Sequence, residues 1–259
     1  MARIVSIAMQ KGGVGKTTTT MNLAAALQQA GQSVLAVDLD PQGNLTQHTG
    51  LNPEQLTPTI YNAFKAEIEG FESNIRQAIY KTHEGFDILP SQPELSLTEL
   101  ALMNTLSRER VLATLLEPLR PLYDYILIDC SPSLGLLVVN ALTASDSVII
   151  PIQAEYLAAR GAYMIMSTIE TVRRKKLNSD LVIDGILLTM ADTRTLMAKD
   201  IQEAVTQQFG SGQRIFQAIV RRSIRFGESA AAGQSILSYE PDSQGAEAYR
   251  QVAQELLHE

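Results

Sequence analysis

The chain has 259 residues, 45% of them hydrophobic, which is enough to bury the core of one α/β domain. No apolar run is long enough to span a bilayer, so a transmembrane protein is excluded, and we expect neither a signal peptide nor a DNA-binding extension before the first strand. The single cysteine, Cys130, excludes a disulfide framework and favours a reducing cytoplasm.

The net charge of −7 is unevenly distributed along the chain. Residues 160–225 contain 11 Lys and Arg against 6 Asp and Glu, whereas the remainder contains 10 against 22. A basic surface can therefore exist locally on an acidic protein, and nucleic acid stays open as a partner.

Apolar, β-branched runs alternate along the chain with longer helical patterns. The expected strands are Ile4–Met9, Ser33–Val37, Phe86–Leu89, Tyr125–Asp129, Ser147–Ile152 and Ile183–Met190. The expected helices are Thr19–Ala30, Leu97–Leu119, Arg160–Leu177, Lys199–Phe209 and Gly245–Leu257. The strands show little alternation, as expected when both faces of a parallel sheet are buried. The pattern predicts one α/β domain over residues 1–259: a single doubly wound, mostly parallel twisted sheet with helices on both faces and ligands at the strand C-termini.

A glycine-rich segment, K-G-G-V-G-K-T-T at residues 11–18, connects the first strand to the first helix. Strand, glycine turn and helix N-terminus in this order are the context of a phosphate-binding loop, because glycines let backbone N–H groups surround phosphate oxygens. In such a loop Lys16 reaches the β- and γ-phosphates and the Thr17 hydroxyl binds Mg²⁺. The residues expected to hold ATP here are Lys11, Gly12, Gly13, Val14, Gly15, Lys16, Thr17 and Thr18.

The loop departs from the general G-x-x-x-x-G-K-[ST] pattern, because Gln10 stands at the first glycine and a second lysine, Lys11, follows it. K-G-G-x-G-K-[ST] is the deviant Walker A motif of the ParA/MinD ATPases, and nearly the whole chain resembles the ParA-type partition ATPases of that family. The resemblance implies a P-loop NTPase fold. It also implies an ATP-bound sandwich homodimer in which Lys11 contacts the nucleotide of the other subunit.

Acidic residues follow two of the expected strands. In V-D-L-D-P-Q-G-N, residues 37–44, the alternate positions Asp38 and Asp40 can point into one crevice. In Y-D-Y-I-L-I-D-C, residues 123–130, the apolar strand ends in Asp129, the Walker B arrangement that holds Mg²⁺ through water. The resemblance makes the first segment switch I, with Asp40 positioning the attacking water and Asp38 near the metal. The expected catalytic residues are Lys11, Lys16 and Asp40, and the expected metal-site residues are Thr17, Asp38 and Asp129.

The segment I-V-R-R-S-I-R-F-G-E-S, residues 219–229, departs from the family pattern I-P-R-N-V-R-L-x-E-A. Arg221 and Ser223 take the positions of the family's proline and asparagine, which are linked with the adenine pocket, so these two altered positions are expected to contact adenine. Family correspondence nominates Arg194 and Arg222 for DNA binding, and Arg225 is added on position. The basic cluster 173–176 either joins them or is the cationic end of a solvated helix.

The resemblance implies a Mg²⁺-dependent ATPase that is slow without a partner. Its ATP dimer would bind double-stranded DNA without sequence preference, associate with the nucleoid in the cytoplasm, and move a plasmid or chromosome. A ParB-like protein would stimulate hydrolysis. Three alternatives stay open: the same ATPase positioning a microcompartment or chemosensory cluster, a MinD-like membrane-associated regulator, and a metabolic P-loop enzyme of the dethiobiotin-synthetase type. The acidic C-terminal helix, with Glu255 and Glu259, counts against membrane targeting.

Overall fold

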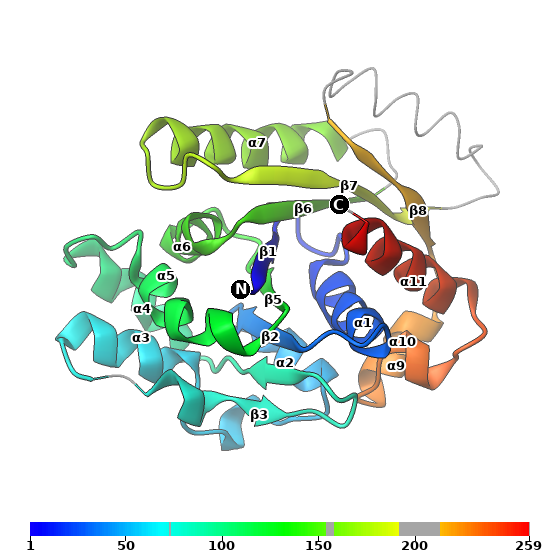
Figure 1. Ribbon diagram of the computed structural model, residues 1–259, viewed down its shortest axis with the longest axis horizontal. Coiled ribbons are helices and arrows are strands. Elements are labelled where there is room, and N and C mark those ends of the chain that lie inside the picture. Colours follow the sequence, from blue (N-terminus) through cyan, green and yellow to red (C-terminus); the bar gives the residue numbers. More distant parts are fainter. Residues whose placement is uncertain (73, 154–157, 192–212, 259) are drawn as a thin grey trace.

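The computed structural model describes residues 1–72, 74–153, 158–191 and 213–258, and one eight-stranded sheet runs through them (Figure 1). The strand order is β3-β4-β2-β5-β1-β6-β7-β8, and every neighbouring pair is parallel except β3 with β4. The strands are β1 (Arg3–Ile7), β2 (Val34–Leu39), β3 (Tyr80–Lys81), β4 (Asp87–Leu89), β5 (Tyr125–Cys130), β6 (Ser147–Gln153), β7 (Val182–Ala191) and β8 (Ile215–Arg221).

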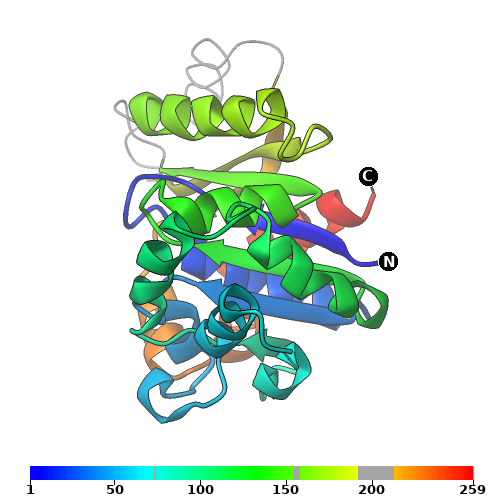
Figure 2. The same cartoon turned by 90° about the vertical axis from the view of Figure 1, so that its left-hand side faces the viewer.

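Helices cover both faces of this sheet, and each face has its own apolar cluster. One face carries α3 (Ile60–Glu69), α4 (Leu95–Met103), α5 (Val111–Leu116), α6 (Leu136–Ala144) and α7 (Ala158–Arg174). The other carries α1 (Lys16–Gln29), α2 (Asn44–His48), α9 (Arg225–Ala231), α10 (Ile236–Tyr239) and α11 (Gln244–Leu257). Figure 2 shows the α3 to α6 side in front of the strands. Three short 3₁₀ turns complete the described elements, at Pro53–Gln55, Ile75–Ala78 and Glu117–Leu122.

Burial on both faces explains why the central strands lack a polar alternation. Every residue of β2 and of β5 is buried, and successive side chains enter the two apolar clusters in turn. The expected doubly wound sheet is confirmed. Because β1 lies between β5 and β6, the chain after β1 leaves the sheet near its centre. At such a point the connections that follow neighbouring strands run to opposite faces of the sheet, and the gap between them is where a ligand crevice is expected.

Several expected elements differ from those found. The helix expected over Leu97–Leu119 is wrong: α4 ends at Met103, and α5 begins at Val111. Ser107 has a φ of 52° between them, a left-handed conformation that interrupts a helix. Asn140 of α6 stabilises this break, because its side chain donates to Arg108 O at 2.8 Å and accepts from Leu112 N at 3.0 Å.

Two strands, β3 and β8, were not expected from the sequence. β3 has only two residues, and β8 alternates between buried and exposed positions at the edge of the sheet. The first helix begins at Lys16 rather than at Thr19. The helix expected over Lys199–Phe209 lies outside the described residues.

Candidate nucleotide-binding site

The glycine-rich segment forms an open loop between β1 and the N-terminus of α1. Gly13 and Gly15 have φ values of 70° and 87°, which side-chain-bearing residues rarely adopt. A Cβ atom on Gly12 or Gly13 would meet no atom within 4 Å, so the backbone there is free to approach a ligand. No side chain caps α1, which leaves the N–H groups of its first turn for an anion.

Two lysines lie at the two ends of this loop. The Lys16 side chain is 6% exposed and donates to Lys11 O at 3.4 Å. Burial lowers the pKa of Lys16, while the carboxylates of Asp129 and Asp40 act in the opposite direction. Lys11 Nζ donates to Gln153 Oε1 at 3.1 Å, at the end of β6. Lys16 is therefore inside the phosphate loop, and Lys11 contacts the neighbouring strand end.

The acids Asp38 and Asp129 are direct neighbours in the register of β2 with β5, and neither is exposed to solvent. Burial raises the pKa of Asp129 well above its ordinary value, and the carboxylate of Asp38 raises it further. A hydrogen bond from Thr17 and the charge of Lys16 lower it. Asp129 Oδ2 is buried and has no hydrogen-bond partner within the described residues, so this oxygen is available to a cation.

Asp38 organises the segment that follows β2. Its Oδ2 accepts from Thr46 N at 2.8 Å and from Thr46 Oγ1 at 2.7 Å, and its Oδ1 accepts from Asp40 N at 3.2 Å. Burial raises the pKa of Asp38 to about 6 despite these bonds. Asp40 is 7% exposed, and its Oδ1 accepts from Gln42 N at 3.0 Å. Asp40 is close enough to Lys16 to raise the pKa of that lysine, and Asp38 fixes the shape of the loop that carries Asp40.

The donor set fits a magnesium ion that is bound together with a nucleotide. No three His, Cys, Asp or Glu side chains of the described part of the chain are close enough to hold a metal ion by themselves. Asp129 offers a buried oxygen that no described residue binds, and the Thr17 hydroxyl donates to the same carboxylate. A hard cation that prefers oxygen ligands and keeps phosphates and water in its shell matches this arrangement.

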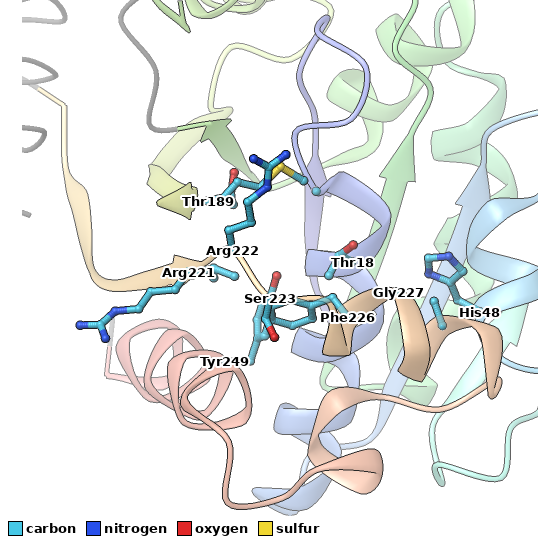
Figure 3. Close-up of a pocket in the computed structure, with 13 residues that line it drawn as sticks. Thr18, His48, Thr189, Arg221, Arg222, Ser223, Phe226, Gly227 and Tyr249 are labelled. Atoms are coloured by element: carbon cyan, nitrogen blue, oxygen red, sulfur yellow. The ribbon is translucent and has the colours of Figure 1, made fainter. Parts of the chain in front are cut away.

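A cavity of about 320 Å³ lies beside the phosphate loop, between the ends of β7 and β8 and the helices α1, α9 and α11 (Figure 3). Phe226 and Tyr249 form one wall, with an edge-to-face contact at 6.0 Å between ring centroids. Thr18 and His48 also line it, and burial lowers the pKa of His48. An aromatic wall next to a phosphate loop suits a flat ring attached to the phosphates.

The two residues expected at the adenine differ in where their side chains point. Ser223 lies at the cavity next to Phe226, whereas the Arg221 side chain leads away from the cavity (Figure 3). Arg221 Nη1 donates to Gln244 Oε1 at 2.8 Å, at the start of α11. The backbone of Arg221 borders the cavity, but its guanidinium group belongs to the surface beside α11.

Arg222 and Arg225, two of the three cations expected to bind DNA, come directly after β8. Arg221, Arg222 and Arg225 line a second cavity of about 250 Å³ against the N-terminus of α11. Arg225 forms ion pairs with Glu228 at 2.7 Å and with Glu240 at 3.6 Å, while Arg222 is exposed. Arg194 lies outside the described residues. The roles of these arginines, like those of the phosphate-loop and acidic residues, stay predictions.

Sequence reasoning missed several residues that the fold brings to the cavity, among them His48, Thr189, Phe226 and Tyr249. Thr189 lies in the last part of an apolar strand, and Tyr249 belongs to the buried face of an amphipathic helix, so both have the pattern of ordinary core residues. Phe226 lies in the segment already singled out for its arginines, and its aromatic ring could have indicated a contact with the nucleotide base.

Comparison with known proteins covers nearly the whole chain. A family model described as an AAA domain matches residues 2–183. The sporulation initiation inhibitor protein Soj of Bacillus subtilis is 42% identical over 256 residues, which is 99% of this chain and 98% of the relative. The chromosome partitioning protein ParA of Myxococcus xanthus is 42% identical over 258 residues, covering 99% of this chain and 88% of the relative.

Among solved structures, cobyrinic acid a,c-diamide synthase from Mycobacterium smegmatis with bound ADP and magnesium has a TM-score of 0.86 at 35% identity, covering 100% of this chain and 95% of that chain. The septum site-determining protein MinD of Pyrococcus horikoshii, complexed with Mg-ADP, has a TM-score of 0.79 at 26% identity, covering 99% and 96%. None of the helices that the structure describes is long and apolar enough to cross a membrane.

Proposed function

The chain belongs to the AAA-domain family and, within it, to the ParA/MinD-type P-loop ATPases, and from this premise we propose that it is a Mg²⁺-dependent ATPase switch for DNA partition. In this proposal ATP closes two copies into a dimer, and the dimer binds double-stranded DNA without sequence preference. The observation that carries the proposal is the open phosphate loop with Lys11 at its start and, at its base, an Asp129 oxygen that has no partner among the described residues.

The phosphates of ATP are assigned to the loop N–H groups and to Lys16, and the adenosine to the cavity beside Phe226 and Ser223. Thr17 and Asp129, with Asp38 behind them, would hold Mg²⁺, which neutralises phosphate charge when bound. Arg221 contributes its backbone rather than its guanidinium group to this cavity, since Gln244 already binds the side chain.

Asp40 is assigned to orienting the water that attacks the γ-phosphate in line. Lys11 is assigned to the nucleotide of the partner copy, where it adds positive charge as an arginine finger does, an effect of about 10³–10⁵ in rate when fully placed. Lys11 contacts Gln153 within its own protomer, so dimerisation would exchange this contact for the partner's phosphates. Hydrolysis is then slow in the monomer and acts as a timer.

DNA binding is assigned to Arg222 and Arg225, and to Arg194, which lies outside the described residues. One protomer neutralises few phosphates, whereas two copies double that number, and the affinity for DNA rises steeply with it. A ParB-like protein would stimulate hydrolysis and release the dimer in a nucleoid-associated cycle in the cytoplasm. The same switch could move a protein cargo instead of a plasmid or chromosome, and the partitioning relatives favour DNA.

The C-terminal helix supports DNA over a membrane as the surface that the switch binds. The apolar side of α11, with Tyr249, Val252 and Leu256, is buried against α1 and β8. Membrane binding by an amphipathic helix requires an apolar side that is free to insert. In α11 that side belongs to the core.

The experiment that tests the proposal is a titration of non-specific duplex DNA at low salt with Mg²⁺, in the presence of no nucleotide, ADP or ATP. We expect the wild-type protein to bind DNA only with ATP, and Lys11→Ala and Arg222→Glu to lose that binding. Asp40→Ala should bind DNA with ATP and release no phosphate above background. Lys65→Ala, an exposed lysine on α3, is the matched charge control. Equal binding in all three nucleotide states, or normal turnover by Asp40→Ala, would contradict the proposal.

A further inference from the structure

The phosphate loop is tied to the end of β7 by one buried hydrogen bond. Thr189 Oγ1 donates to Val14 O at 2.8 Å across 175 residues of sequence. Thr189 is 2% exposed and Val14 is 1% exposed, so water does not satisfy the carbonyl in its place. The Thr189 methyl group lies 3.9 Å from the position that a Cβ of Gly15 would take, so this side chain lies beside Gly15 as well as Val14.

This bond fixes the orientation of a peptide group that matters for phosphate binding. The carbonyl of Val14 and the N–H of Gly15 belong to the same planar trans peptide and point in opposite directions. A hydroxyl that draws the carbonyl toward β7 therefore turns the Gly15 N–H toward the inside of the loop. Gly15 has a φ of 87° and no Cβ, so this peptide would rotate with little resistance without the tether.

The neighbouring strand end holds the other end of the same loop. Gln153 of β6 is the register partner of Thr189, and it accepts from Lys11 Nζ at 3.1 Å. Gln153 and Thr189, which are adjacent across the sheet, thus bind Lys11 and Val14, which are three residues apart in the loop. The ends of β6 and β7 therefore hold the loop from outside it.

We propose that Thr189 is a positioning residue for nucleotide binding, which acts by directing the Gly15 N–H at a phosphate of ADP or ATP. The proposal rests on the nucleotide-binding function proposed above. Thr189 acts on the ligand through the loop, and its hydroxyl is the group that matters. Without this hydroxyl the Val14 carbonyl is buried without a hydrogen-bond partner. Part of the free energy of nucleotide binding is then used to orient the peptide between Val14 and Gly15, and the affinity falls.

The test compares ADP binding by Thr189→Val and Thr189→Ser, measured calorimetrically with Mg²⁺ and alongside the melting temperature without nucleotide. Thr189→Val keeps the volume and loses the donor, and we expect its Kd for ADP to rise about tenfold. Thr189→Ser keeps the donor and loses the methyl group, and we expect its Kd to stay within about twofold of wild type although the lost methyl lowers its melting temperature. A purely structural role predicts instead that affinity follows the melting temperature in both variants.

Thr143→Val is the matched control, because Thr143 is also buried and its hydroxyl has no hydrogen-bond partner within the described residues. We expect it to bind ADP as wild type does. If Thr189→Val does not fold, Thr189→Ser against Thr189→Ala gives the same comparison of donor and no donor. If the wild type binds ADP and Thr189→Val binds it with the same affinity, the inference is overturned; the same holds for Thr189→Ala where that variant replaces Thr189→Val. If the wild type does not bind ADP, the proposed function is overturned instead.

Discussion

Asp38 and Asp129 lie side by side on neighbouring strands without access to solvent, and both have raised pKa values. Burial is the largest cause for each; the carboxylate of Asp38 raises the pKa of Asp129 further, and the carboxylate of Asp40 raises that of Asp38. Two adjacent buried carboxylates are costly to ionise unless cations approach them. Lys16 is one such cation, and a divalent ion at Asp129 would be a second. At the scale of single residues, the site of the free protein therefore contains negative charge on Asp38 and Asp129 that the cation of a metal–nucleotide complex can neutralise.

This arrangement predicts a pH-dependent loss of stability in the protein without metal or nucleotide. The folded-state pKa of Asp38 is about 6 and its ordinary value is 3.8, so the folded protein binds more protons than the unfolded chain between these values. Its free energy of unfolding therefore falls as the pH rises through this interval. Asp38→Asn removes the titration, and we expect wild type to lose on the order of 2 kcal/mol relative to this variant between pH 4.5 and 6.5.

Urea unfolding at several pH values in EDTA measures this difference. The Asn side chain disturbs the hydrogen bonds from Thr46 and Asp40, which costs stability at every pH, so the informative quantity is the change of the difference with pH. Parallel profiles for the two proteins would show that Asp38 does not titrate in this range.

Sequence motifs singled out the residues of the phosphate and acid site because these residues belong to strand ends and to one turn, and their roles stay predictions. Lys16, Asp40 and Asp129 meet in the crevice through local geometry and parallel strand pairing alone. The cavity was harder to predict, since His48, Phe226 and Tyr249 come from three helices whose packing no local pattern describes. Arg221 shows the limit of alignment: it takes an adenine-linked position, but its side chain binds Gln244.

Among whole elements, the buried strands and the first and last helices were predictable from apolar runs, and connections and edges were not. The break between α4 and α5 depends on Asn140, which is distant in sequence, and β8 is a half-exposed edge strand. The contact between the end of α2 and the turn after α9 is also invisible to sequence patterns. There Gly233 packs against Gly50, and a Cβ on Gly233 would lie 2.8 Å from Gly50 Cα.

We expect Gly233→Ala to destabilise the fold more than Gly70→Ala does. Both glycines have positive φ, 67° and 75°, so both substitutions carry the left-handed penalty of about 1–2 kcal/mol. A Cβ at position 70 meets nothing within 4 Å, whereas at position 233 it meets backbone that must shift. Urea unfolding of both variants measures the difference, which we expect to be at least ~1 kcal/mol.

Because the turn at Gly233 follows α9, which carries Phe226, Gly233→Ala should also weaken nucleotide binding. Gly70→Ala, at the end of α3, should not. Equal stability losses in the two variants would mean that the contact between Gly50 and Gly233 is not a tight one.

On the scale of the whole molecule, the acidic chain concentrates part of its positive charge at one end of the sheet. β8 is the terminal strand there; Arg221 is its last residue and Arg222 and Arg225 follow, while the opposite edge is formed by β3. Two of these three arginines have partners, Arg221 with Gln244 and Arg225 with Glu228 and Glu240. Substitution of Arg222 is therefore the most direct test of the DNA-binding proposal on a single protomer.

The dependence of DNA affinity on salt concentration shows whether a dimer or a monomer is the unit that binds DNA. Each neutralised phosphate contributes about 0.9 to the slope of log K against log salt concentration. If the ATP dimer binds DNA through Arg222 of both copies, Arg222→Ala should lower the magnitude of this slope by about 2 in the ATP state, because one substitution removes two contacts. Lys65→Ala, on α3 beside the other end of the sheet, should leave the slope unchanged. A decrease of about 1 would mean that one protomer of the pair contacts DNA, and no decrease would remove Arg222 from the interface.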